Sequence, residues 1–194
     1  MKRVFDFTVS LLMIILLSPL MLIIGLIILI DDGTPVIFKQ YRVGKDNKLF
    51  YIYKFRTMRK NTRNVATNEL EESDTMITRS GKLLRKTSLD ELPQLFNILS
   101  GKMSFVGPRP LIPEEKEIRI LRAKYNVYSV RPGMTGLAQI NGRDVLTYQQ
   151  KAELDREYVE NRSLFGDLVI LFKTVSVVLS AKDVVEGSEK VNKR

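Results

Sequence analysis

The chain has 194 residues, enough for one domain with a core of its own. Its formal net charge of +9 favours an anionic partner (nucleic acid, a phosphate-bearing substrate or anionic lipid) or simply aids solubility. It contains neither cysteine nor histidine, which excludes disulfide bonds, thiolate nucleophiles, Ser-His-Asp triads and histidine-rich zinc sites, so any acid–base or nucleophilic chemistry must fall to Asp, Glu, Lys, Tyr, Ser or Thr.

Residues 7–30 are apolar almost throughout and predict a helix in the membrane. A bilayer core takes roughly 20 apolar helical residues. The apolar part of a signal peptide is shorter, about 7–15 residues, and precedes a small-residue cleavage site. A helix buried in a soluble core is also a poor fit, because this segment is apolar on every side. We therefore expect a membrane helix rather than a cleaved leader.

Ser18 and Pro19 lie in the middle of this segment and predict a break in its helix. Proline removes one backbone hydrogen bond and clashes with the preceding turn, and the Ser18 hydroxyl can satisfy a freed backbone group. Lys2 and Arg3 precede the segment and a basic excess follows it, and positive residues prefer the cytoplasmic side. If both ends obey this rule, the segment is a re-entrant helix–break–helix hairpin. The alternative is a kinked helix that spans the membrane.

The sequence predicts three parts: a re-entrant membrane helix over residues 1–32, a cytoplasmic catalytic domain over 33–182 and a polar tail over 183–194. The expected fold class is α+β and mainly helical. Residues 36–39 and 48–55 are rich in Val, Ile, Phe and Tyr and predict a β-hairpin, with a turn at 44–47. Residues 59–78 are polar and predict a long loop.

Helical periodicity and helix-breaking residues predict five helices, over residues 80–87, 92–99, 114–125, 147–161 and 164–180. A short strand is expected at 137–140. The last helix carries Leu168, Phe172 and Val175 on one side, with Lys173 nearby. Core packing and a position in the lipid headgroup plane both account for this pattern.

Asp90 and Glu91 are the strongest candidates for catalytic residues in the sequence, because two adjacent carboxylates follow two cations and precede an apolar helix. A purely structural role is one interpretation. Ser88 and Glu91 have the spacing of a capping box, and Asp90 as the N-cap would place Pro93 at a helical position that tolerates proline. The functional interpretation also depends on the position of Asp90 at the start of a helix. A helix N-terminus favours phosphate, and a carboxylate beside Mg²⁺ there can attack phosphorus to form an acyl phosphate.

Several turns carry a cation that would suit phosphate, although spacing alone does not show that these cations converge on the Asp90-Glu91 pair. Gly107, Pro108, Arg109 and Pro110 predict a stiff, extended segment that holds the Arg109 guanidinium in place for phosphate. The other candidates for a cationic ring are Lys54, Arg56, Arg131 and Arg143, the last two in glycine-containing turns. Each turn is an ordinary structural feature when taken alone.

Together these residues resemble a known family, the bacterial sugar transferases, which are small monotopic phosphoglycosyl transferases. The resemblance covers nearly the whole chain and rests on motifs in the family's order: KRVFD (2–6), SP (18–19), YKFRTM (53–58), LRKTSLDELPQL (84–95), FVGPRP (105–110), RPGMTG (131–136) and QINGR (139–143). Several long motifs in one order are highly specific.

The resemblance implies a reaction and a role for each site residue. Asp90 would attack the β-phosphate of a UDP-sugar, release UMP and carry the phosphosugar to a polyprenol (undecaprenyl) phosphate. Asp90 would also contact Mg²⁺, with Glu91 as its partner and Arg85 orienting both. Arg109 and Arg143 would bind phosphate or nucleotide, and Ser18-Pro19 would make the membrane helix re-entrant. The expected location is the cytoplasmic face of the bacterial inner membrane, in contact with membrane lipid.

Two alternative functions follow from the charge and the apolar segment. One is a membrane-anchored nucleic-acid-binding protein, although the chain has no recognisable helix-turn-helix or stacking platform, so we expect no nucleic acid partner. The other is a non-catalytic scaffold for other glycan enzymes. The sugar is not readable from the sequence, because a few side-chain contacts decide such selectivity. A monomer and a homodimer are both compatible with the chain.

Overall fold

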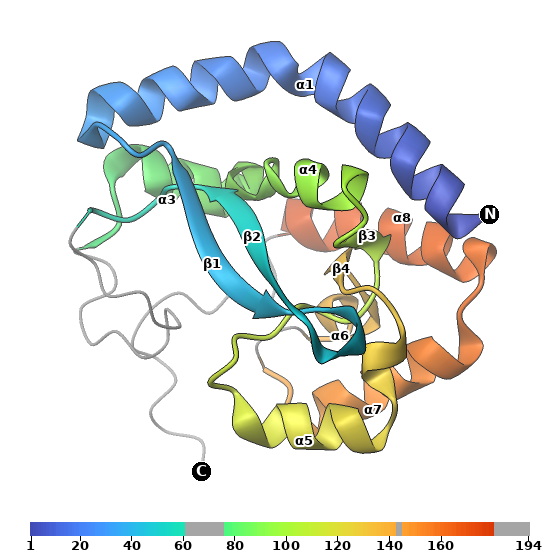
Figure 1. Ribbon diagram of the computed structural model, residues 1–194. Coiled ribbons are helices and arrows are strands. Elements are labelled where there is room, and N and C mark those ends of the chain that lie inside the picture. Colours follow the sequence, from blue (N-terminus) through green and yellow to red (C-terminus); the bar gives the residue numbers. More distant parts are fainter. Residues whose placement is uncertain (61–75, 143–144, 181–194) are drawn as a thin grey trace.

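The computed structural model describes residues 1–60, 76–142 and 145–180 (Figure 1). The fold is α+β and mainly helical, as predicted. The polar tail expected over 183–194, and most of the loop expected over 59–78, lie outside the described residues. The elements are α1 (Lys2–Asp32), β1 (Ile37–Val43), η1 (Lys45–Asn47), β2 (Leu49–Phe55), α3 (Arg79–Thr87), η3 (Leu89–Glu91), α4 (Gln94–Leu99), β3 (Ser104–Val106), α5 (Lys116–Lys124), η4 (Val127–Ser129), β4 (Gly133–Thr135), α6 (Leu137–Ile140), α7 (Tyr148–Asn161) and α8 (Leu164–Ser180), where η denotes a 3-10 helix.

Helix α1 lies on the surface of the molecule and leaves most of its apolar side chains exposed. By length and composition it can cross a membrane, with a mean hydropathy of 3.1 over its most apolar window. Figure 1 shows α1 arching over α3 and α4. Only 11% of that window is buried, mainly where Ile24 and Ile28 pack on Leu84 and Leu92. A core helix of a soluble protein would be mostly buried, so the exposure fits the predicted membrane segment.

The helix is continuous through Ser18 and Pro19, so the predicted interruption at these residues is wrong. Instead, α1 changes direction near its middle (Figure 1). Pro19 has no N–H to offer to the carbonyl four residues earlier, and the Ser18 hydroxyl donates to that carbonyl, Ile15 O, at 2.9 Å. The freed acceptor is therefore satisfied within the helix, as an apolar surrounding requires. Entry and exit on one membrane face stays a prediction.

Polar side chains fix the N-terminal half of α1 to the rest of the chain. Lys2 forms an ion pair with Asp167 at the start of α8. The buried Asp6 accepts a hydrogen bond from the backbone N–H of Phe105 in β3, at 3.3 Å. Arg3 donates to the carbonyls of Ile98 and Leu99 and so caps the C-terminus of α4. The apolar helix is thus joined to three elements by contacts that only one orientation satisfies.

The predicted β-hairpin is confirmed, and its first strand runs further than expected, to Val43. Strands β1 and β2 pair antiparallel, with Ile37 opposite Phe55 and Val43 opposite Leu49. Their even-numbered residues face the inside of the molecule, because Phe50 and Ile52 are buried in the main core.

The free edge of β2 is covered by one side chain of α4, that of Asn97. Its Nδ2 donates to Tyr51 O at 2.7 Å, and its Oδ1 accepts from Tyr53 N at 3.0 Å. The buried amide thereby takes the place of a neighbouring strand. This contact holds the hairpin against the helix that follows Asp90.

All five predicted helices are present, and the strand expected at 137–140 is wrong. Those residues form α6, a single helical turn that Gly136 begins and in which Ile140 N donates to Gly136 O at 3.2 Å. Four apolar residues carry no period that separates helix from strand. The strand of this region lies just before them, at β4, which pairs parallel with β3.

Helix α8 has one face buried in the molecule and another that is apolar and exposed, and its position in the headgroup plane stays a prediction. Asp167 and Ile170 are buried on one of its faces, whereas Phe165 and Phe172 on the other are 78% and 77% exposed. One face therefore packs on the core. The other leaves a stripe of apolar side chains uncovered, in keeping with an interfacial helix.

Candidate active site

Asp90 and Glu91 lie in a tight turn between two helices. Helix α3 ends at Ser88, whose backbone is left-handed (φ 56°), and the short helix η3 then carries both carboxylates before Pro93 leads into α4. The abrupt change of direction at Ser88 brings Asp90 into the interior, where it is buried, rather than onto the exposed face of a longer helix. The turn therefore serves to present these two side chains.

The predicted capping roles are wrong. Pro93, not Asp90, occupies the position before α4, and no side chain caps that helix. Ser88 likewise makes no side-chain cap, so no capping box forms with Glu91. A proline in front of α4 already removes one N–H that would need a partner. The carboxylate of Asp90 is consequently not committed to holding a helix end.

Lys54 at the end of β2 faces both carboxylates. Its Nζ lies 2.7 Å from Glu91 Oε1 and 3.9 Å from Asp90 Oδ2, and the three side chains are only 12–19% exposed. Burial raises the pKa of Asp90 above its ordinary value and Glu91 adds to the rise, while Lys54 and Arg85 oppose it. Asp90 is thus a desolvated carboxylate whose ionisation depends on nearby cations, as expected of a reactive group.

Arg85 approaches from the last turn of α3. Its Nε donates to Thr57 Oγ1 at 2.9 Å, and its charge lowers the pKa of Asp90. Thr57 lies two residues after the end of the strand that carries Lys54. The hydroxyl therefore fixes Arg85 relative to Lys54, and the orienting role that the resemblance implies stays a prediction.

The segment from Gly107 to Pro110 follows β3 and packs closely against β4. Gly107 N donates to Thr135 O and Gly133 N donates to Pro108 O, both at 2.9 Å. A Cβ on Gly133 would lie 2.1 Å from Gly107 N, and one on Gly136 would lie 2.2 Å from Gly107 O. Only glycine allows this approach, so the two turns are built as one unit.

The carbonyls that follow in this segment are each held by a donor from another element. Arg122 Nη1 of α5 donates to Arg109 O at 2.7 Å, and Arg42 Nη1 of β1 donates to Pro110 O at 3.3 Å. Val43 N then donates to Leu111 O at 2.8 Å. The backbone around Arg109 is therefore fixed at successive residues.

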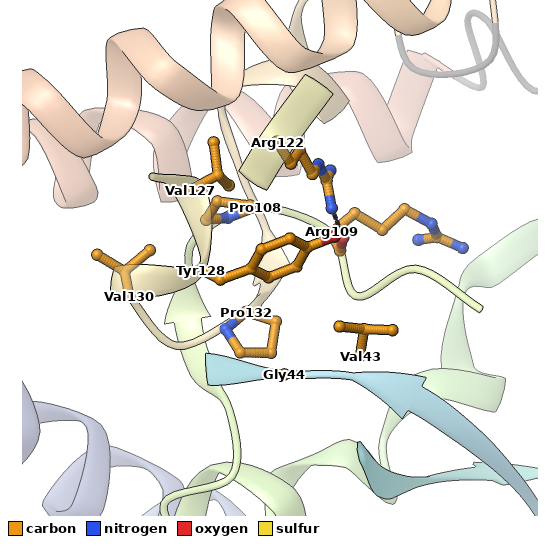
Figure 2. Close-up of a pocket in the computed structure, with 9 residues that line it drawn as sticks. All are labelled: Val43, Gly44, Pro108, Arg109, Arg122, Val127, Tyr128, Val130 and Pro132. Carbon is orange, nitrogen blue, oxygen red and sulfur yellow. Dashed lines mark hydrogen bonds between the residues drawn. The ribbon is translucent and has the colours of Figure 1, made fainter. Parts of the chain in front are cut away.

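Figure 2 shows a small pocket behind this segment, into which Tyr128 and Pro132 project, while the Arg109 guanidinium extends away from it. The residues that line it are Val43, Gly44, Pro108, Arg109, Arg122, Val127, Tyr128, Val130 and Pro132. Neither Asp90 nor Glu91 is among them. This pocket supports the backbone of the Arg109 turn and is not the place of the carboxylate chemistry.

The structure places two of the predicted arginines elsewhere. Arg56 is buried at the C-terminus of α1, where it pairs with Asp32 at 3.0 Å and donates to Gly33 O at 2.7 Å. Arg131 Nε donates to Gly101 O at 2.7 Å, beyond the far end of α4. Arg143 lies outside the described residues. Within the part of the chain that the structure describes, the cations whose charges lower the pKa of Asp90 are Lys54 and Arg85.

Sequence reasoning missed Arg42 and Arg122. Arg42 lies close enough to Arg109 and Glu91 for both charges to act on its pKa. Its position could have been found by extending the predicted strand 36–39 towards the turn at 44–47, because alternation then puts Arg42 and Gln40 on one face. Nothing in the local sequence separates Arg122 from the exposed cations of its helix.

Buried carboxylates beside cationic turns, on a chain with an apolar surface helix, are typical of a membrane-associated enzyme that acts on anionic groups. The chain belongs to the bacterial sugar transferases, because the family described as "Bacterial sugar transferase" matches residues 1–181. This finding confirms the resemblance.

Named relatives give the family further detail. An undecaprenyl-phosphate galactose phosphotransferase of Salmonella typhimurium is 43% identical over 92% of this chain and 40% of its own length. The uncharacterized sugar transferase EpsL of Bacillus subtilis is 42% identical over 99% of this chain and 92% of its own. A UDP-glucose:undecaprenyl-phosphate glucose-1-phosphate transferase of Klebsiella pneumoniae is 42% identical over 90% of this chain and 39% of its own. The chain thus spans about two fifths of some relatives and nearly all of others.

Proposed function

We propose that this chain transfers a sugar phosphate from a UDP-sugar to undecaprenyl phosphate, at the cytoplasmic face of the bacterial inner membrane. The observation that carries the proposal is the state of Asp90: a buried carboxylate, free of any capping role, whose Oδ2 lies 3.9 Å from the Nζ of Lys54. The names of two relatives mention undecaprenyl phosphate as acceptor and glucose or galactose as the sugar. Transfer would begin the assembly of a capsule, exopolysaccharide or glycoprotein glycan.

In the first step a carboxylate oxygen of Asp90 attacks the β-phosphorus of the donor. A bond forms between Asp90 and that phosphorus, the bond to the bridging oxygen breaks, and UMP leaves with the electron pair. In the second step a phosphate oxygen of undecaprenyl phosphate attacks the same phosphorus, and the Asp90 carboxylate leaves. No oxidant or reductant is needed, and Asp90 is regenerated.

Lys54 and Glu91 prepare Asp90 for this role. A desolvated carboxylate is more nucleophilic than a hydrated one, but burial also favours its protonated form. Lys54, fixed by its 2.7 Å contact with Glu91 Oε1, supplies the positive charge that keeps Asp90 ionised. Glu91 thereby acts through the lysine that it holds in place.

Mg²⁺ fits the donor set of this site. The described residues hold no group of three or more carboxylates, and two neighbouring carboxylates are what Mg²⁺ uses when phosphate oxygens and waters complete its shell. Asp90 and Glu91 are the residues that would hold it. When bound, Mg²⁺ would neutralise charge on the diphosphate.

A panel of UDP-sugars tests the proposal, scored for UMP release by the full chain with undecaprenyl phosphate and Mg²⁺ in detergent or nanodiscs. We expect at least one donor to give UMP in turnover amounts, that is, many per chain, only when the acceptor is present. Silence across glucose, galactose, N-acetylgalactosamine and diacetamido donors, in protein that is correctly inserted, would contradict it.

A further inference from the structure

Arg56 and Arg122 are buried, and Arg42 is half-buried with a buried Nε that has no hydrogen-bond partner. These three arginines differ in how their charge is balanced. Arg56 pairs with Asp32 at 3.0 Å and Arg122 pairs with Asp155 at 2.5 Å. Arg42 donates instead to neutral acceptors, to Gln40 Oε1 at 2.6 Å and to Pro110 O at 3.3 Å. Within residues 1–60, 76–142 and 145–180 no carboxylate forms an ion pair with it. A desolvated guanidinium without a counterion is costly, unless a ligand supplies the negative charge.

Arg42 stands at one end of a polar row on the inner face of the hairpin. Phe38 pairs with Lys54 across the two strands, so the side chains of Lys54, Gln40 and Arg42 project from the same face. Alternate residues on a strand are about 7 Å apart. These three side chains therefore form a row along the inner face of the hairpin. Lys54 at one end faces Asp90 and Glu91, and Arg42 at the other end contacts the segment that carries Arg109. The buried Gln40 lies between them.

A second positive charge lies beside Arg42. Its guanidinium contacts the carbonyl of Pro110, the residue after Arg109. The pKa of Arg42 is lowered to about 10, first by burial and then by the charge of Arg109. Glu115, Glu91 and Glu114 favour the charged form from a distance but do not offset burial. The charges of Arg42 and Arg109 repel each other, and an oxyanion bound by both guanidiniums would remove that repulsion.

We propose that Arg42 and Arg109 form a two-guanidinium site for a phosphate-bearing ligand, joined to Asp90 by the row through Gln40 and Lys54. The planar fork of each arginine suits phosphate oxygens. The diphosphate of a sugar nucleotide and the phosphate of a polyprenol share this chemistry. The identity of the natural ligand rests on the proposed function. The claim that the two arginines bind a phosphate-type anion does not.

A purely structural Arg42, which only holds Pro110 O, predicts a different outcome for the same substitution. Arg42→Met keeps the side-chain volume and removes the charge. If Arg42 serves a ligand, losing an unbalanced buried charge leaves the melting temperature unchanged or raises it, while phosphate binding weakens. If Arg42 serves the fold alone, the melting temperature falls and ligand affinity per folded molecule stays the same.

The experiment compares wild type, Arg42→Met, Arg42→Lys and Lys39→Met as full chains in detergent. Lys39 is the matched control, because it is exposed on the opposite face of the same strand. Inorganic pyrophosphate, UDP and undecaprenyl phosphate in mixed micelles are titrated separately, and melting temperatures are recorded. We expect Arg42→Met to bind pyrophosphate roughly tenfold to hundredfold more weakly at an unreduced melting temperature, and Lys39→Met to bind like wild type.

The two further ligands identify the source of the anion. Weaker UDP binding assigns the site to the donor diphosphate, and weaker undecaprenyl phosphate binding assigns it to the acceptor. Unchanged affinity of Arg42→Met for all three ligands overturns the proposal. Should this variant not fold, Arg42→Lys decides, because it keeps the charge but loses the fork: weaker pyrophosphate binding at an unreduced melting temperature supports the site, and unchanged binding overturns it.

The outcomes also separate this site from the proposed reaction. If the protein binds pyrophosphate through Arg42 but releases no UMP from any donor, the anion site is supported and the proposed transfer reaction is excluded. If Arg42→Met has the kcat and KM of wild type, the transfer reaction is supported and the proposed anion site is excluded.

Discussion

Two buried ion clusters of this protein have the same ingredients and different geometry. Between α5 and α7, Arg122 and Asp155 are 4% and 1% exposed and meet at 2.5 Å. In the candidate active site, Lys54 meets Glu91 at 2.7 Å but stays 3.9 Å from Asp90. Burial raises the pKa of both aspartates, and the neighbouring cation opposes the rise in both. The first cluster is closed on itself and holds helices together, whereas the second leaves one carboxylate available to a substrate.

Asp90→Asn gives the largest expected effect on activity. An amide has no nucleophilic carboxylate oxygen, so UMP release should fall by a factor on the order of 10⁴ or more. Stability should not fall. The raised pKa of Asp90 means that its ionised form disfavours the folded state at neutral pH, and asparagine removes that cost.

The pH dependence of stability checks the same point. Thermal unfolding of Asp90→Asn should match or exceed wild type at pH 7. The difference should shrink as the pH falls below the ordinary pKa of 3.8, where Asp90 is protonated in both the folded and unfolded chain. A destabilised variant would indicate that Asp90 serves the fold.

Arg122→Met should produce the largest loss of stability, about 3–5 kcal/mol, because it leaves Asp155 buried without a partner. The double variant Arg122→Met/Asp155→Val should recover most of it, since neither charge remains. Unfolding curves of the three proteins measure this. Equal stability of the single variant and wild type would show that the closed cluster contributes little.

The double variant also separates stability from activity. Arg122 Nη1 holds Arg109 O, and methionine cannot donate that hydrogen bond. We expect the double variant to be stable yet to show a KM for the sugar nucleotide raised severalfold, with a smaller change in kcat. If the double variant recovers both the stability and the KM of wild type, the Arg109 turn does not need the hydrogen bond from Arg122.

Lys54→Met should lower kcat/KM by about 10²-fold, the usual effect of losing one electrostatic contact in a catalytic site. It should also move the acid limb of the pH–rate profile to higher pH. Activity needs ionised Asp90, and removing the adjacent cation raises the pKa of that carboxyl further. The exposed Lys48 on the turn side of β2 offers a control, Lys48→Met, whose profile should match wild type. An unmoved acid limb in Lys54→Met would exclude Lys54 from this role.

Ser18→Ala should give the smallest effect, about 1 kcal/mol, because it removes the donor that satisfies Ile15 O beside Pro19. The melting temperature in detergent should drop slightly while the rate of transfer stays unchanged. Replacing Pro19 with alanine as well should restore the melting temperature, since residue 19 then has a backbone N–H that can donate to Ile15 O. A double variant less stable than Ser18→Ala would contradict this account of the bend.

The hairpin and the longer helices were predictable from the sequence because their signals are local. Alternating Val, Ile, Phe and Tyr define β2, and the Thr147 capping box marks the start of α7. Residues 137–140 failed because four apolar residues carry no period. The continuity of α1 through Pro19 depended on one hydroxyl–carbonyl contact, which a count of helix breakers does not weigh.

The candidate site was predictable in its residue types but not in its geometry. Asp90, Glu91 and Lys54 stand out by charge and context. Whether Asp90 caps a helix depends on the left-handed backbone of Ser88, which no nearby glycine announces. Likewise, Arg42 and Arg56 have the same chemistry, and only tertiary packing gives one a carboxylate partner and the other a neighbouring guanidinium.

The most direct test of the account is the covalent intermediate at Asp90. The full chain is incubated with a donor that supports UMP release, without undecaprenyl phosphate, and its intact mass is measured. We predict one added sugar phosphate per chain, with the mass expected for the donor used. Peptide analysis should map it to the segment that contains Asp90, undecaprenyl phosphate should discharge it, and Asp90→Asn should lack it. Rapid transfer by Asp90→Asn, or a phosphosugar attached to another residue, would contradict the central claim.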